Sequence, residues 1–206
     1  MTEPIPATDP DRSRRPVAAV LAGGRASRLG GDKANAVLAG NSLLGRALAS
    51  LEAAGLEAFV VSKRDRPVEV EGVEVVIEED EPQHALAGIA TAIRQAGDRQ
   101  VIVLACDLPL LPVAYLEWLA AHDGGSLIPC PGGELQPLAA RYSPADLGPI
   151  EAALAREAPA RQAAAGLGAT LITDAELARF GDPAVTFFNV NTADDLLRAE
   201  ALLAAR

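Results

Sequence analysis

Aromatic and sulfur-containing side chains are scarce in this sequence of 206 residues. Phe, Tyr and Trp make up 3% of the chain while half of it is hydrophobic, so Ala, Leu and Val must build the core. The 2 cysteines, Cys106 and Cys130, lie in or beside apolar runs, which suits small buried side chains and gives no sign of a disulfide framework. The 2 histidines, His84 and His122, are too far apart to form a zinc-binding pattern.

The chain also lacks an excess of basic residues and long apolar runs. It has 18 Lys and Arg against 28 Asp and Glu, a net charge of −10. This balance argues against general binding to nucleic acid or to an anionic membrane, although it leaves room for a local basic pocket. No run is long enough to span a membrane, and the first residues lack the apolar core of a signal peptide. We therefore expect a cytoplasmic protein with no membrane and no nucleic-acid partner.

Short apolar runs alternate with helical patterns from residue 17 onward. This alternation is typical of βαβ units and predicts an α/β fold: a Rossmann-like, mainly parallel (mixed) sheet with helices on both faces. We expect a disordered, Pro-rich tail over residues 1–16 and a single domain over residues 17–206. The predicted strands are 17–21, 58–62, 73–77, 101–105, a short strand near Leu171, and 184–188.

Capping residues and glycines mark the predicted helices. Ser42 caps a helix that stops at Gly55, and Thr192 caps the last helix with Asp195 in capping-box position. Further helices are predicted over 86–97, from Pro112, from Asp146 and around Ala160. Residues 126–130 and 136–142 flank the turn PGGE and are expected to form a hairpin.

The segment Val20–Ala34, VLAGGRASRLGGDKA, combines glycines with basic side chains directly after the first predicted strand. Glycines allow backbone N–H groups to approach an anion closely, and the carboxyl ends of parallel strands are where open α/β sheets bind ligands. A Walker loop is excluded because Lys33 follows Asp32 and precedes Ala34, and the spacing of a dinucleotide fingerprint is missing. The pattern favours a phosphate chain as the ligand.

The segment resembles the nucleotidyltransferase signature L-A-G-G-x-[SA]-x-R-[ML]-G-x-D-K. The matching residues are Leu21, Ala22, Gly23, Gly24, Arg28, Leu29, Gly30, Asp32 and Lys33. Asp before Lys points to the molybdenum cofactor guanylyltransferase (MobA-like) family. The resemblance continues, in order, in LAG at 86–88, CDLP at 106–109, QPLAARY at 136–142 and NVNTADDL at 189–196, and thus spans nearly the whole chain after the tail.

The resemblance implies a Mg²⁺-dependent transfer of GMP from GTP to molybdenum-molybdopterin with release of pyrophosphate. The attacking oxygen already belongs to an anion, so catalysis is mostly positioning and charge neutralisation. Arg28 and Lys33 are the expected catalytic cations. Asp107 closes the strand 101–105, where a hard oxygen ligand suits Mg²⁺, although an aspartate that only caps the following turn fits the pattern as well.

The resemblance also implies a set of nucleotide contacts. Ser62 competes with a plain strand-end serine for this role, and Asp80 competes with Glu79 and with a solvated acidic turn. The implied nucleotide-binding residues are Leu21, Ala22, Gly23, Gly24, Lys33, Ser62, Asp80, Gly88 and Asp107.

Asn189 and Asn191 are the implied acceptor-binding residues, and they point the same way if the strand 184–188 continues through them. The alternative is that these side chains only bond the turn before Thr192. The resemblance names a phosphorylated molybdopterin-type acceptor, and it leaves open whether a molybdoenzyme or a chaperone receives the product.

One departure from the family pattern bears on nucleotide preference. His84-Ala85 stands where the family commonly has Gly-Pro before Leu-Ala-Gly, so a related enzyme that uses CTP or another phosphorylated acceptor fits as well. A non-catalytic nucleotide-binding protein is the alternative of another class, and the presence of both Lys33 and Asp107 argues against it. The oligomeric state and the acceptor-gripping residues, Arg141 and Arg161 among the candidates, do not follow from the sequence.

Overall fold

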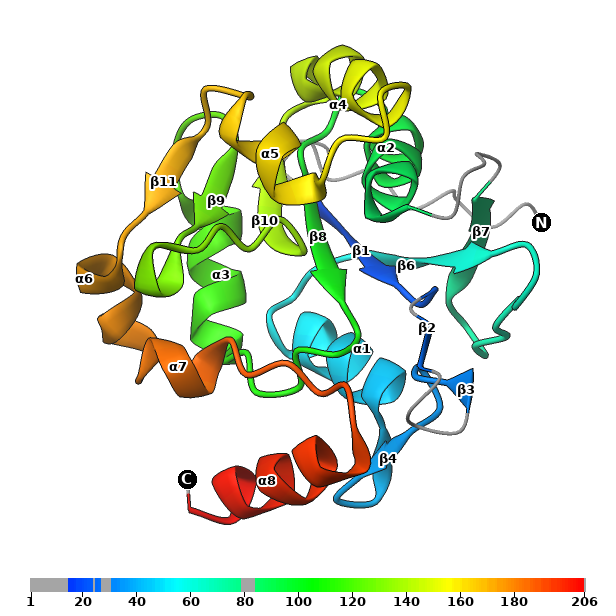
Figure 1. The fold of residues 1–206 in the computed structure, drawn as a ribbon, viewed down its shortest axis with the longest axis vertical. Helices are drawn as coiled ribbons and strands as arrows, with labels where there is room; N and C mark the ends of the chain where they lie inside the picture. The colour runs from blue at the N-terminus through cyan, green and yellow to red at the C-terminus, as the bar shows by residue number, and fades with distance from the viewer. Residues whose placement is uncertain (1–14, 24, 27–30, 79–83, 206) are drawn as a thin grey trace, which may run out of the picture.

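The structure is a computed structural model that describes residues 15–23, 25–26, 31–78 and 84–205. A seven-stranded sheet runs through the centre of these residues, in the order β11-β9-β10-β8-β1-β6-β7 (Figure 1). Only β10 runs antiparallel to its neighbours within this sheet, so the sheet is mixed and mainly parallel, as predicted. The strands are β1 (Val17–Leu21), β6 (Ala58–Lys63), β7 (Glu74–Glu78), β8 (Val101–Ala105), β9 (Leu127–Pro129), β10 (Ala139–Tyr142) and β11 (Thr170–Ile172).

Both faces of the sheet are covered because its central strands are apolar on both sides. In β1, Ala18 and Val20 face one core cluster while Val17 and Ala19 face the other. The first cluster includes side chains of α1 (Leu43–Ala53), α3 (Val113–Ala121) and α6 (Asp174–Leu177). The second includes side chains of α2 (Ala85–Ala96), α4 (Leu147–Leu154) and α5 (Ala160–Ala165). The prediction of helices on both faces is confirmed.

The caps that the sequence predicts lie at the helix ends. The Ser42 side chain accepts a hydrogen bond from the backbone N–H of Gly45 at the start of α1, and Gly55 follows that helix with a φ of +67°. Gly97 ends α2 with a φ of +63°. Thr192 and Asp195 form a capping box at the start of α8 (Ala193–Ala204).

The strand predicted over 184–188 is wrong. Residues Pro183–Thr186 form a short helix, α7, whose start is capped by the Asp182 side chain accepting from the N–H of Ala184 at 2.9 Å. The β-branched and aromatic run suggests a strand, but an aspartate cap followed by proline at the first helical position starts a helix here.

Two small antiparallel ribbons come between β1 and α1 in the sequence. One pairs β2 (Arg25–Ala26) with β3 (Gly31–Asp32), and Lys33 follows β3 directly. The other pairs β4 (Val37–Leu38) with β5 (Asn41–Ser42), and α8 packs on it around Leu38, Leu43, Val190 and Ala199. Figure 1 shows α8 beside β4, at one end of the molecule.

The remaining short elements connect the outer strands. The expected hairpin is confirmed as the antiparallel pair β9–β10, and its connection contains η1 (Pro131–Gly133). Two further 3-10 turns are η2 (Pro144–Asp146) and η3 (Ala178–Phe180). Neither Cys106, which is buried, nor Cys130, which is partly buried, forms a disulfide. Among the described residues, no helix has the length and apolar character needed to cross a membrane.

Candidate active site

The site lies at the carboxyl edge of the parallel strands β8, β1, β6 and β7. The backbone N–H of Cys106 donates to the carbonyl of Leu21 at 3.5 Å, and that of Ala22 donates to Val61 at 2.9 Å, so the strand ends stay side by side beyond the ladders. The residues that follow β1 and β8 therefore meet at one edge.

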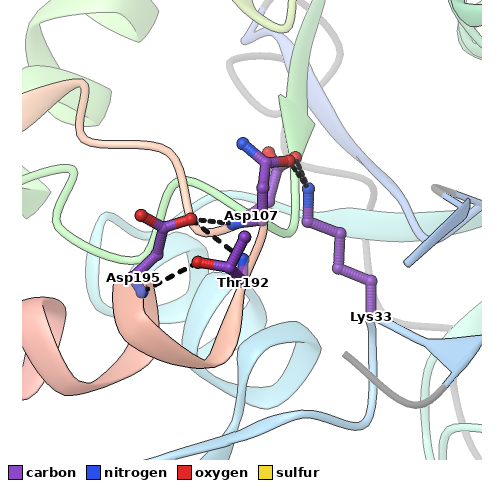
Figure 2. Close-up of polar contacts among 5 residues, drawn as sticks. Lys33, Asp107, Thr192 and Asp195 are labelled. Carbon is purple, nitrogen blue, oxygen red and sulfur yellow. Dashed lines mark hydrogen bonds and ion pairs between the residues drawn. The ribbon is translucent and has the colours of Figure 1, made fainter. Parts of the chain in front are cut away.

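Lys33 and Asp107 form an ion pair at this edge, although they are 74 positions apart in the sequence. Figure 2 shows the Lys33 side chain reaching toward Asp107. The Lys33 ammonium also donates to Oδ1 of Asn191 at 2.7 Å. Only 7% of the Lys33 side chain and 16% of the Asp107 side chain are exposed, so water screens the pair weakly.

Separate elements position the three side chains. The β2–β3 ribbon leads back toward the end of β1, and Lys33 is the residue that follows it. Asp107 follows β8, and its carbonyl accepts from the N–H of Val190 at 2.9 Å. That bond ties the segment before α8 to the end of β8 and brings Asn191 within reach of Lys33.

The capping box of α8 fixes the backbone of Asn191. Oδ2 of Asp195 accepts from the N–H groups of Asn191 and Thr192, each at 2.9 Å, and the Asp195 N–H donates to the Thr192 hydroxyl at 3.1 Å. Figure 2 shows Thr192 and Asp195 at the start of α8, next to Asp107. The N–H of Asn191 is the main cause of a lowered pKa of the Asp195 carboxyl, with the bonds from Thr192 adding to it.

The Asp107 carboxylate retains a free acceptor. Its Oδ2 contacts Lys33, whereas its Oδ1 is buried and has no hydrogen-bond partner. A buried carboxylate oxygen without a partner is costly, and a hard cation that brings its own oxygen ligands would satisfy it. Within the described residues no three His, Cys, Asp or Glu side chains gather as a metal cage. The unpartnered oxygen of Asp107 suits Mg²⁺, which proteins commonly hold through one or two carboxylates plus substrate phosphates.

The predicted nucleotide contacts on β1 and α2 also come together. A methyl group on Gly88, in the first turns of α2, would lie 2.9 Å from Cδ1 of Leu21, so glycine permits the close approach of this helix to the end of β1. His84 caps α2, and its Nδ1 accepts from the N–H of Leu86 at 3.2 Å. The histidine that departs from the family pattern thus has a structural role at the helix start.

Ser62 lies in β6 with its hydroxyl engaged by the following loop. The hydroxyl donates to the carbonyl of Arg66 at 3.1 Å and accepts from the N–H of Val68 at 3.0 Å, and the residue is fully buried. These bonds favour the alternative of a strand-end serine that holds its own loop. We therefore leave Ser62 out of the nucleotide contacts proposed below.

Some of the predicted site residues lie outside the described part of the chain. These are Gly24, Arg28, Glu79 and Asp80. Asn189 is described and exposed, but α7 replaces the strand that was expected to align it with Asn191. Of that pair, Asn191 is the residue that contacts Lys33.

Residues 18–175 match the family model described as the MobA-like NTP transferase domain. The chain belongs to this family. The protein is therefore a nucleotidyltransferase, as the sequence predicts, and the MobA-like fold accounts for its mainly parallel sheet.

Two relatives and one solved structure illustrate what this MobA-like chain is similar to. It is 32% identical over 213 residues to the molybdenum cofactor guanylyltransferase of Rhizobium meliloti, covering 94% of each chain. It is 36% identical over 130 residues to a protein of Opitutus terrae named "Probable molybdenum cofactor guanylyltransferase", covering 60% of this chain and 64% of that one. The crystal structure of molybdopterin-guanine dinucleotide biosynthesis protein A from Archaeoglobus fulgidus superposes with a TM-score of 0.75 at 27% identity, over 92% and 99% of the two chains.

The same edge of the sheet also carries an ion pair that the sequence did not predict. Lys63 and Glu78 are the last residues of β6 and β7, face each other in the ladder and form an ion pair. The sequence does show a charged residue at the carboxyl end of each of these two strands, and that pattern could have drawn attention to Lys63 and Glu78. Their contact, however, depends on strand order and register.

Proposed function

We propose that this protein transfers GMP from GTP to the phosphate of molybdenum-molybdopterin, releasing pyrophosphate. An oxygen of the acceptor phosphate bonds to the α-phosphorus of GTP, and the bond from that phosphorus to the bridging oxygen breaks. The attacking oxygen is already ionised, so no strong base is required. Family membership supports the reaction class, and the names of the relatives support GTP and the acceptor.

The observation that carries the proposal is the convergence of Lys33, Asp107 and Asn191 at the carboxyl edge of the sheet. A buried ammonium at this edge offsets triphosphate charge, and one unit pair at 4 Å is worth about 4 kcal/mol at an effective dielectric constant near 20. Asn191 holds the ammonium in place. Arg28 remains a predicted second cation, and Asn189 and Asn191 remain predicted acceptor contacts.

Asp107 is the residue that would hold a divalent cation, through the oxygen that has no partner. Bound there, Mg²⁺ would supply charge neutralisation at the phosphate oxygens. This chain's own residues would orient the reactants: the segment of Leu21, Ala22 and Gly23, called the Gly23 turn below, would line the nucleotide side, and Gly88 lies close to Leu21. The contribution expected of them is positioning rather than proton transfer.

Pyrophosphate release measured separately with GTP, CTP, ATP and UTP, with Mg²⁺ and a molybdopterin acceptor, tests the proposal. We expect GTP to be the preferred substrate. Preference for CTP would assign the protein to the related cytidylyl transfer, and binding without turnover of any nucleotide would indicate a non-catalytic protein.

Asp107→Asn keeps an oxygen for Lys33 but removes the negative charge. We expect kcat to fall by about 10²-fold or more, the scale seen when one preorganised electrostatic group is lost. Because the buried Lys33 ammonium loses its counter-ion, the unfolding midpoint should fall, but far-UV circular dichroism should show that the variant is folded under assay conditions. Asp98→Asn, at an exposed position after α2, is the matched control. Full activity of the Asp107 variant would remove this residue from the mechanism.

A further inference from the structure

The Lys63–Glu78 pair occupies the opposite side of β1 from the Lys33–Asp107 pair, because β6 and β8 are the two neighbours of β1. Only 12% of the Lys63 side chain and 4% of the Glu78 side chain are exposed. The ammonium and the carboxylate neutralise each other, so the pair adds no net charge that would attract a phosphate.

The stem of Lys63 lies directly against Gly23. A methyl group on Gly23 would be 2.4 Å from Cγ, 2.8 Å from Cε and 3.0 Å from Cδ of Lys63. Real β-carbons do not approach other atoms this closely, so the turn and the stem fit together only because residue 23 has no side chain. The φ of Gly23 is not positive, so the contact with Lys63, and not the backbone conformation, is what excludes a side chain.

Glu78 completes the contact from the other side. A methyl group on Gly88 would lie 3.6 Å from its Oε2, which places the carboxylate between β7 and the first turns of α2. By bonding the ammonium, Glu78 fixes the end of the Lys63 side chain, so the stem between them is held across Gly23.

Stability alone gives little reason for such a pair. Desolvating two charges costs about as much as their attraction returns, and an apolar replacement of similar volume is often equally stable. A held stem, in contrast, determines how close the Gly23 turn lies to β6. The turn is the part of the glycine-rich segment that the proposed function places against the nucleotide.

We propose that Lys63 is a positioning residue for nucleotide binding: its stem, anchored by Glu78, supports the Gly23 turn. The inference rests on the proposed function. Lys63 contacts the turn and acts through it, in contrast to Lys33, whose charge serves the phosphates. Loss of the stem should therefore weaken nucleotide binding while the transfer step is unchanged.

The test compares Lys63→Ala/Glu78→Gln with Lys63→Met/Glu78→Gln. Both variants remove the two buried charges together, so neither leaves a lone buried ion, but only the methionine keeps a stem. With the alanine variant we expect the KM for GTP to rise at least about tenfold with kcat little changed, the signature of lost uniform binding. The methionine variant should restore KM to near the wild-type value. Equal KM values for the two variants would overturn the proposal.

A second comparison tests the contact between Gly23 and the Lys63 stem directly. Gly23→Ala alone should weaken binding of a fluorescent GTP analogue, because its β-carbon meets the Lys63 stem. Added to Lys63→Ala/Glu78→Gln, the same substitution enters the vacated space and should cause little further loss of affinity. A further loss as large as that caused by Gly23→Ala alone would mean that the β-carbon meets the nucleotide instead, which would overturn the role of Lys63.

The controls separate this inference from the proposed function. Arg94→Met/Glu151→Gln removes an exposed ion pair between α2 and α4 and should change neither KM nor affinity. A wild-type protein that binds no GTP would overturn both proposals. Binding by the wild type with no change in any Lys63 variant would overturn only this one.

Discussion

Two buried lysine–carboxylate pairs flank the end of β1, and they differ in what their carboxylates still offer. Asp107 retains an oxygen without a partner, whereas Glu78 is nearly covered between its strand and α2. In the proposed function, the first pair exchanges partners when a nucleotide and a cation bind. In the inference drawn from Gly23, the second pair stays together. The two proposals therefore give the same two residue types a reactive role on one side of the strand and a supporting role on the other.

Arg141 shows a third use of a buried cation. Its guanidinium donates to the carbonyls of Leu119, His122, Gly124 and Gly125, and the residue is only 1% exposed. Burial lowers the pKa of this guanidinium, with the charge of Asp123 opposing the shift. It joins β10 to the end of α3 and to the loop that follows, so it is neither a surface charge nor a contact for the acceptor.

Arg141→Met should destabilise the fold strongly because the carbonyls beneath it lose their donors. Each stranded buried group costs about 1–3 kcal/mol, so we expect the free energy of unfolding to fall by at least about 3 kcal/mol. Urea denaturation measures this, with Arg161→Met as the control at an exposed ion pair. A change below about 1 kcal/mol would mean that water replaces the guanidinium at little cost.

At the level of single residues, the sequence singled out three residues that the structure brings together, but it did not predict their contacts. Lys33, Asp107 and Asn191 each stand in a motif, so resemblance located them individually. Their meeting depends on the return of the β2–β3 ribbon and on the bond between Val190 and Asp107. Lys63 and Glu78 stand in no motif, and their pairing follows from a ladder register that one sequence does not contain.

Among the elements, α8 links the C-terminal part of the chain to the site. Its capping box fixes Asn191, which contacts Lys33. Another capping box, Thr173 with Glu176, starts the short helix α6 and has no contact with Lys33, Asp107 or Asn191. The two boxes have the same chemistry at different places, so one serves as a control for the other.

The pKa values of Asp195 and Glu176 are both lowered, chiefly by backbone N–H groups, of Asn191 for the former and of Thr173 for the latter. A lowered folded-state pKa means that the stabilisation is present above the unfolded value, about 4, and is lost as the pH falls through the folded value. The difference in stability between wild type and Asp195→Asn, or Glu176→Gln, should therefore be constant near neutral pH and shrink below about pH 4.

Activity distinguishes the two variants. Asp195→Asn should lower kcat/KM near neutral pH because Asn191 loses its anchor, whereas Glu176→Gln should leave it unchanged. Chemical denaturation from pH 3 to 7 and steady-state kinetics measure the two effects. Equal kinetics for both variants would mean that the capping box of α8 does not position the site.

Element by element, the sequence predicted the strands and helices whose pattern and caps agree. β1 and β8 are apolar throughout, the first four residues of β6 are apolar, and α1, α2 and α8 carry matched starts or stops. The prediction failed over 184–188, where the β-branched and aromatic run outweighed the Asp182-Pro183 start of α7. β7 lies one residue later than predicted, and that residue is Glu78, which is why the second ion pair was not foreseen.

The whole molecule is organised around strands that serve two cores at once. Alternate residues of β1 and β8 enter the two apolar clusters, so neither cluster can lose its packing without exposing the strands of the other. The active-site edge is part of the same strands. Residues 17–206 should therefore unfold as one cooperative unit, in agreement with the single domain predicted from the sequence.

Two variants, each with a cavity in one of the two cores, test whether the molecule unfolds as one cooperative unit. Leu116 belongs to the first apolar cluster, which includes α1 and α3, and Ile93 belongs to the second, which includes α2 and α4. Both side chains are buried, and the two variants are Leu116→Ala and Ile93→Ala. Each should cost about 2–5 kcal/mol and lower a single midpoint in scanning calorimetry by several degrees. Because both cores depend on the same strands, neither variant should split the transition, and the calorimetric and van't Hoff enthalpies should agree. Two separate transitions in either variant would mean that the layers on the two faces unfold independently, and the sheet would then not couple the site to both cores.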